Sequence, residues 1–173
     1  MSSDGRSGAG GRRKSRTTID AGFLRVLHQI HARLSGRNVN WVVTGSLGWA
    51  LQGVPVEVHD VDVQTDAAGA YEIERCFSEF VVERVVFSSA ERIRSHFGVL
   101  MIDEIKVEIM GDVQKRREDG GWEDPVDLEC YRRGVEIEGL EIPVLSLEYE
   151  WQAYLKLGRT EKAEHLRRWL DDS

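Results

Sequence analysis

The stretch from Val43 to Val63 constrains the fold more than any other part of the chain, because it combines a buried strand, a small-residue turn and two closely spaced acids. Residues 41–43 form a short apolar run with β-branched side chains, which predicts a buried strand. Gly45 and Ser46 end this strand, and 47–51 is expected to be helical. A strand, a tight turn and a helix start expose unpaired backbone N–H groups, so the segment predicts an anion-binding site.

Strict alternation of polar and apolar residues follows in 58–63. In a strand, side chains two positions apart lie on one face, so Asp60 and Asp62 are expected to project together while Val61 and Val63 face the core. Adjacent carboxylates repel unless a cation lies between them, and Mg²⁺ commonly binds one or two carboxylates together with substrate phosphates. For an isolated Asp-x-Asp, the alternative is an ordinary solvated strand face.

The combination of Gly45-Ser46 with Asp60-Val61-Asp62 resembles the signature of the DNA polymerase beta-like nucleotidyltransferase superfamily, in particular its small stand-alone members, which are antibiotic-modifying or toxin-type proteins. The resemblance implies an α/β (α+β) fold, with a small mixed, mostly antiparallel sheet and flanking helices. Small-molecule and toxin-type members often carry Arg, Thr and then Lys or His ahead of the acids. Here the segment reads Glu57-Val58-His59, so only His59 matches.

The resemblance also implies a third carboxylate on a neighbouring strand. Two apolar runs, 97–102 and 105–110, are joined by Asp103-Glu104, which predicts a tight hairpin. In the second run, the apolar residues at 105, 107 and 109 share one face, which leaves Glu108 on the other face and makes it the predicted third acid. The superfamily usually has Asp at this position. Asp103, Glu104 and Asp112 are the alternatives, and Asp112 is the strongest of them if Gly111-Asp112 ends the strand.

A looser resemblance lies near the C-terminus. Residues 144–148 and 154–159 are similar to the strand, helix and Lys-x-x-Arg segment of small superfamily members, whose basic residues approach the triphosphate or brace the sheet. Lys156 and Arg159 are three apart, so they would share a face on a continuing helix. The alternative is a pair of surface cations.

The mechanism that the resemblance implies is two-metal transfer of a nucleoside monophosphate from an NTP. Two Mg²⁺ ions would be held by Asp60, Asp62 and Glu108, and Glu108 would help to deprotonate a hydroxyl or amine of the acceptor. The triphosphate would contact a second set of residues: Gly45, Ser46, Lys156 and Arg159. The acceptor is a small molecule, or alternatively a protein or tRNA as in toxin-type members, which would imply an antitoxin-like protein partner. A catalytically inactive nucleotide-binding or interaction domain of the same fold is the third interpretation.

Charge and composition narrow these alternatives. The first 18 residues hold five basic residues and one acid, whereas the whole chain has a net charge of −7. We predict a disordered basic tail over 1–18 and one domain over 19–173. The acidic body disfavours nucleic acid as the main partner and favours a neutral or cationic acceptor. No apolar run approaches the roughly 20 residues needed to span a bilayer, no secretory signal is visible, and the two cysteines suit reduced thiols in the cytoplasm.

Less distinctive segments yield further expectations. Residues 91–96 are expected to form a helical or turn segment, and 114–129 an exposed loop or lid. A second hairpin is expected at 135–144, across Glu138-Gly139. Two closing helices follow, over 147–157 and 161–170, and Thr160 is expected to cap the second one.

Overall fold

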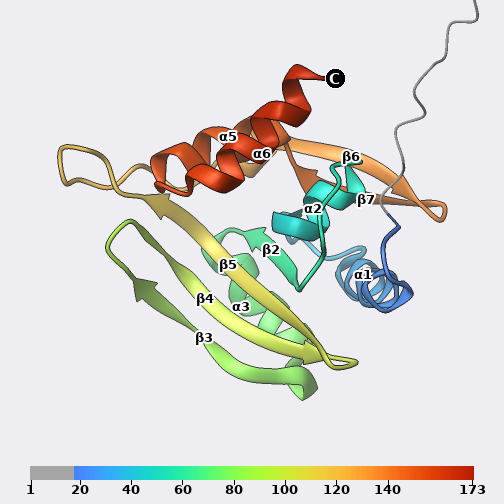
Figure 1. The fold of residues 1–173 in the computed structure, drawn as a ribbon. Coiled ribbons are helices and arrows are strands. Elements are labelled where there is room, and N and C mark those ends of the chain that lie inside the picture. The colour runs from blue at the N-terminus through green and yellow to red at the C-terminus, as the bar shows by residue number, and fades with distance from the viewer. Residues whose placement is uncertain (1–17) are drawn as a thin grey trace, which may run out of the picture.

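A single mixed β-sheet organises the computed structural model, which describes residues 18–173 (Figure 1). Its strands are β1 (Trp41–Thr44), β2 (Val61–Thr65), β3 (Val81–Ser89), β4 (Ile93–Ile102), β5 (Ile105–Lys115), β6 (Arg132–Ile137) and β7 (Leu140–Leu145). The helices are α1 (Ala21–Leu34), α2 (Gly45–Leu51), α3 (Ala67–Cys76), the 3-10 helix η1 (Ser78–Phe80), α4 (Leu128–Tyr131), α5 (Leu147–Lys156) and α6 (Thr160–Asp171).

The strand order is β3-β4-β5-β2-β1-β7-β6. The pairs β2–β5 and β1–β7 are parallel, and the other four neighbouring pairs are antiparallel. The expected mixed, mostly antiparallel sheet with flanking helices is therefore confirmed, as are the two predicted hairpins, β4–β5 and β6–β7.

The register of the central strands aligns polar residues in a row. Thr44 of β1 lies opposite Asp62 of β2, and Asp62 lies opposite Glu108 of β5. Neighbouring side chains at paired positions project from the same face of a sheet. Two strands distant in sequence thus bring Asp62 and Glu108 side by side.

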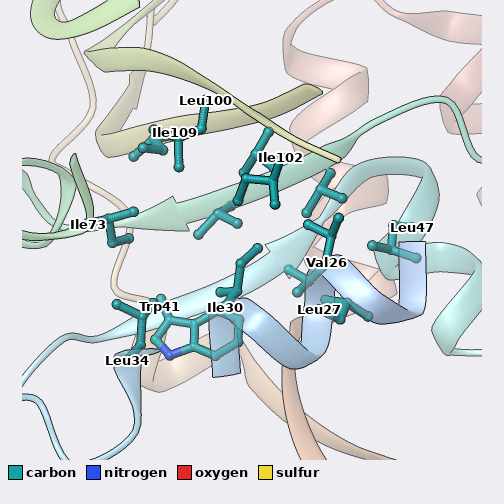
Figure 2. Close-up of a cluster of buried hydrophobic side chains, with 14 of the residues drawn as sticks. Val26, Leu27, Ile30, Leu34, Trp41, Leu47, Ile73, Leu100, Ile102 and Ile109 are labelled. Carbon is teal, nitrogen blue, oxygen red and sulfur yellow. The ribbon is translucent and has the colours of Figure 1, made fainter. Parts of the chain in front are cut away.

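The opposite face of these strands is covered by α1 and α3. Figure 2 shows Val26, Leu27 and Ile30 of α1 packed against the sheet, and each is at most 2% exposed. The alternating partners in β2, Val61 and Val63, are also buried in this cluster. Each fully buried aliphatic side chain contributes about 1.5–3 kcal/mol. Because this face of the sheet is committed to the core, Asp62 must project from the other face.

On that other face, α5 and α6 pack together with Trp49 and Val54 in a second cluster that includes Tyr154 and Leu166. Figure 1 shows these two helices lying side by side, on the other side of the sheet from α1 and α3. The helices α5 and α6 thus cover the face of the sheet from which Asp62 and Glu108 project.

Three expectations about strands are wrong. β2 begins at Val61 rather than at 58, so Asp60 lies just before the strand. Residues 93–96, expected to be helical or a turn, form the start of β4, because they pair with the extended end of β5. Gly111 does not end β5, which continues to Lys115. A Cβ at Gly111 would lie 2.7 Å from the Asp66 carbonyl oxygen, so this glycine lets the strand pass close to the start of α3.

Two expectations about the C-terminal half also need correction. Residues 114–129 are not simply an exposed loop, because Lys115 is only 4% exposed and Arg116 pairs with Trp122. Lys156 and Arg159 do not share a continuous helix: α5 ends at Lys156, Gly158 has a φ of +69°, and Arg159 is the N-cap of α6. Thr160 is the first residue of α6 and provides no side-chain cap.

The predicted basic tail of 1–18 falls, except for Thr18, outside the described residues, and the predicted single domain stays a prediction. Within residues 18–173, no helix is both long and apolar enough to cross a membrane. Cys76 and Cys130 are free thiols.

Candidate active site

Three carboxylates converge where β2 and β5 pair. One oxygen from each of Asp60, Asp62 and Glu108 lies within 4.8 Å of the other two. Asp60 comes from the bend before β2, Asp62 from β2 itself and Glu108 from the paired position in β5. Their side chains are partly exposed, so the oxygens are accessible to an ion. The structure therefore brings together the three acids that the sequence singled out.

The alternative acids lie elsewhere. Asp103 and Glu104 form the turn of the β4–β5 hairpin with φ values of 51° and 65°, and Asp103 accepts a hydrogen bond from Gln29. Asp112 sits at a register shift in β5 with a φ of 50°. None of these acids belongs to the group of three, which favours Glu108 as the third carboxylate.

The surroundings of Asp62 and Glu108 change the pKa values of these two acids. Burial, then the charge of Asp60 and the hydrogen bond and charge of Glu108, raise the pKa of Asp62 from 3.8 to about 8. Burial alone would also raise the pKa of Glu108, but hydrogen bonds from Lys106 and Asp62 outweigh burial and lower that pKa. In this state the Lys106 ammonium lies 2.8 Å from Glu108 and 3.3 Å from Asp60.

This arrangement fits a divalent cation. Carboxylate oxygens are the hard ligands that Mg²⁺ prefers, and a bound cation would relieve the repulsion that keeps Asp62 protonated. Lys106 partly provides such positive charge in the described structure.

The turn between β1 and α2 lies directly against these acids. Gly45 has a φ of +67°, and a Cβ at this position would lie 2.2 Å from an oxygen of Asp62. Only glycine therefore fits beside Asp62 in this backbone conformation. Ser46 lines the cleft above the acids, and its Oγ lies 3.4 Å from the backbone nitrogen of His59.

Glu150 was not predicted from the sequence, yet it holds this turn in place. It is 2% exposed, and its Oε1 accepts hydrogen bonds from the Thr44 hydroxyl and from the Gly45 backbone N–H, the latter at 3.0 Å. Its Oε2 accepts a 3.1 Å hydrogen bond from the Trp49 indole. Burial raises the pKa of Glu150 to about 7, against the opposing effect of these hydrogen bonds. The Gly45 N–H is thus used within the protein, contrary to its expected availability for a phosphate.

The signal that could have revealed Glu150 is its position in α5. The buried residues of this helix are Leu147, Glu150 and Tyr154, a spacing that defines one helical face. An acid on the apolar face of a helix needs hydrogen-bond donors from elsewhere in the fold.

The acids open into a cleft of about 820 Å³ between the sheet and the helices α5 and α6. Of the predicted phosphate ligands, Gly45, Ser46 and Arg159 line this cleft. Lys156 does not, because its ammonium bonds Glu123 at 2.6 Å instead. Lys162 and His165 of α6, which follow Arg159 closely in sequence, also line the cleft, and the sequence analysis did not predict them.

Comparison with known proteins identifies the family of this chain. The family model described as aminoglycoside-2''-adenylyltransferase matches residues 26–168. A nucleotidyltransferase candidate from Thermotoga maritima, TM1012, has a solved structure with a TM-score of 0.81 and 68% identity, covering 91% of this chain and 98% of that chain. Among curated proteins, no significant match was found.

Two more distant solved structures share the fold. ANT(2'')-Ia in complex with adenylyl-2''-tobramycin has 14% identity and a TM-score of 0.57, over 86% of this chain and 90% of that chain. The lincomycin-bound lincosamide antibiotic adenylyltransferase LnuA has 11% identity and a TM-score of 0.54, over 87% and 98%. With the family model covering most of the sequence, the chain belongs to the aminoglycoside-2''-adenylyltransferase family, and it is a nucleotidyltransferase.

Proposed function

We propose that this enzyme transfers a nucleoside monophosphate from an NTP to a hydroxyl or amine of a small molecule, with two Mg²⁺ ions held by Asp60, Asp62 and Glu108. The observation that carries the proposal is the convergence of these three acids at the floor of a cleft, beside a glycine turn. When bound, the ions would stabilise charge on the attacking and leaving oxygens of the displacement.

The protein residues have separate tasks in this proposal. Glu108 belongs to the group of three acids at the floor of the cleft, and its carboxylate can accept the proton of the acceptor. Ser46 donates a hydrogen bond to a phosphate oxygen, and Gly45 lets the backbone of the turn lie close to the phosphate. Arg159 neutralises charge on the pyrophosphate, because it lines the cleft. Lys156 can share this task only after leaving Glu123.

A small-molecule acceptor is favoured by the relatives and by the size of the cleft. ANT(2'')-Ia and LnuA are both solved with antibiotic-derived ligands, although they resemble this chain in fold alone. Protein or tRNA acceptors, an antitoxin-like partner and a cytoplasmic location stay predictions. The inactive-domain interpretation is disfavoured because all three acids remain together.

The test is to incubate the protein with each labelled NTP, Mg²⁺ and a cell extract, and then to separate the label into small molecules, RNA and protein. We expect label in the small-molecule fraction, lost with chelator and in Asp60→Asn. Asp103→Asn serves as the control, because that acid lies in the hairpin turn away from the group. Label in RNA or protein would move the acceptor to another class, and transfer by Asp60→Asn at the normal rate would refute the assigned site.

A further inference from the structure

Lys106 places a positive charge among the three acids of the site. It lies two positions before Glu108 on β5, so both side chains project from the same face of the strand. Its ammonium lies 2.8 Å from Glu108 and 3.3 Å from Asp60. Among the described residues, neither of these two acids forms an ion pair with any other side chain. Lys106 thus bridges an acid of β5 and an acid that precedes β2.

A divalent ion held by the same acids would compete with this ammonium. Mg²⁺ lies about 2.1 Å from a carboxylate oxygen, so an ion on the Glu108 oxygen that Lys106 contacts would come within about 5 Å of the ammonium. Two cationic groups at that separation repel each other. For a free ion to bind Asp60 and Glu108, the ammonium must therefore move away from them.

The surroundings of Lys106 allow this movement. Its side chain is 44% exposed, and Lys106 is not one of the residues that line the cleft. Lys115, the other lysine of β5, is only 5% exposed, and its ammonium donates a 2.6 Å hydrogen bond to the Tyr149 hydroxyl. Lys106 can thus turn on its flexible stem toward solvent or toward a ligand, whereas Lys115 is enclosed.

A metal ion that arrives on a triphosphate presents a different charge to Lys106. Free Mg²⁺ is a cation, whereas its complex with an NTP is a net anion, because the triphosphate carries more charge than one ion neutralises. Mg²⁺ commonly binds one or two carboxylates together with substrate phosphates, so the phosphates come to lie beside the same acids. The ammonium is then able to exchange a carboxylate oxygen for a phosphate oxygen.

We propose that Lys106 is a positioning residue that makes the site selective for metal ions bound to a nucleotide. Its ammonium holds Asp60 and Glu108 together and disfavours free Mg²⁺, and it moves to the triphosphate when the metal–NTP complex binds. This inference rests on the proposed function, because it requires the three acids to hold the ions. It explains how the ions and the nucleotide come to bind together.

The test compares two binding measurements on the full chain. The first follows binding of Mn²⁺ alone by electron paramagnetic resonance, and the second follows binding of a preformed complex of Mn²⁺ with a non-hydrolysable ATP analogue by calorimetry. Lys106→Met should bind free Mn²⁺ about tenfold more tightly than the wild type, as expected when a unit charge about 5 Å from a divalent ion is removed in a solvated site. The same variant should bind the Mn²⁺–nucleotide complex no more tightly than the wild type.

Three further variants control for charge and for folding. Lys106→Arg keeps the positive charge and should keep the weak binding of free Mn²⁺. Arg84→Gln removes a positive charge from an exposed position of β3, two strands away from β5, and should change neither measurement. Lys106→Gln repeats the neutralisation with a polar side chain, and it replaces Lys106→Met in the comparison if that variant has a lowered melting temperature.

Unchanged binding of free Mn²⁺ by the neutral variants would overturn the inference. Tighter binding of the free ion and of the complex by the same factor would also overturn it, because Lys106 would then merely repel cations. Label transfer from NTP combined with unchanged Mn²⁺ binding would refute the role of Lys106 and leave the proposed function standing. The expected Mn²⁺ pattern without any label transfer would leave the metal selectivity standing and refute the transfer.

Discussion

Asp62, which is partly exposed, and Glu150, which is buried, have carboxyl groups that respond to different surroundings. Asp62 is destabilised as an anion by burial and by two neighbouring acids, whereas Glu150 is destabilised by burial and partly compensated by three donors. A bound cation would stabilise the Asp62 carboxylate, whereas the hydrogen bonds of Glu150 hold the Gly45 turn in place. Asp62 was predictable because its partner Asp60 is two residues away. Glu150 was not, because its donors lie 101 to 106 residues earlier in the chain.

Glu150 should make stability depend on pH. Its pKa is raised from 4.5 to about 7, so between these values the folded protein keeps a proton that the unfolded chain has lost. The free energy of unfolding therefore falls as the pH rises through this window. Relative to Glu150→Gln, the wild type should lose up to about 3 kcal/mol across it.

Urea unfolding at both ends of this window measures the difference. Glu148→Gln, an exposed acid on the same helix, should keep the wild-type pH dependence. The same slope in wild type and Glu150→Gln would show that Glu150 does not titrate in this range.

Gly45→Ala should impair the site beyond its effect on the backbone. A positive φ costs a non-glycine residue about 1–2 kcal/mol, and the new Cβ would also displace the Asp62 carboxylate. Gly36→Ala is the matched control, since Gly36 has a φ of +74° and no atom within 4 Å of an added Cβ. Both variants should be destabilised, but only Gly45→Ala should lose Mg²⁺-dependent affinity for an NTP analogue in calorimetric titration. Equal affinity in the two variants would contradict the contact.

At the scale of whole elements, local sequence patterns predicted β1, α2 and both hairpins, because each depends on periodicity and turn residues within a short window. The start of β4 was missed because residues 93–96 become a strand only by pairing with the end of β5. The same holds for Gly111, which looks like a strand end in sequence but is required by the close approach of α3. Long-range pairing, rather than local propensity, decides such segments.

Gly111→Ala tests this explanation of β5. The added Cβ would meet the backbone oxygen of Asp66 and the Cβ of Ala70 at 2.7 and 2.8 Å, neither of which can turn away. We expect a loss of about 1–3 kcal/mol in the free energy of unfolding. Gly134→Ala is the control in β6, where the nearest atom is the flexible Glu141 side chain. A variant Gly111→Ala as stable as Gly134→Ala would show that the contact with α3 is not tight.

At the scale of the whole molecule, the positively and negatively charged residues are unevenly distributed. A chain with a net charge of −7 places Asp60, Asp62 and Glu108 together at the floor of the cleft, and the cations Arg159 and Lys162 line the same cleft from the C-terminal helices. Composition alone could not predict this separation, because it arises from the strand order and from which face each strand presents.

The central claim is that Asp60, Asp62 and Glu108 together bind the catalytic metal ions. The most direct measurement is electron paramagnetic resonance of Mn²⁺, used in place of Mg²⁺, with the protein and a non-hydrolysable ATP analogue. We predict that two ions bind per nucleotide-bound chain, and that Asp60→Asn, Asp62→Asn and Glu108→Gln each lose at least one of them, whereas Asp103→Asn loses none. Full binding of both ions by any of the first three variants would contradict the assignment of that residue, and full binding by all three would contradict the account.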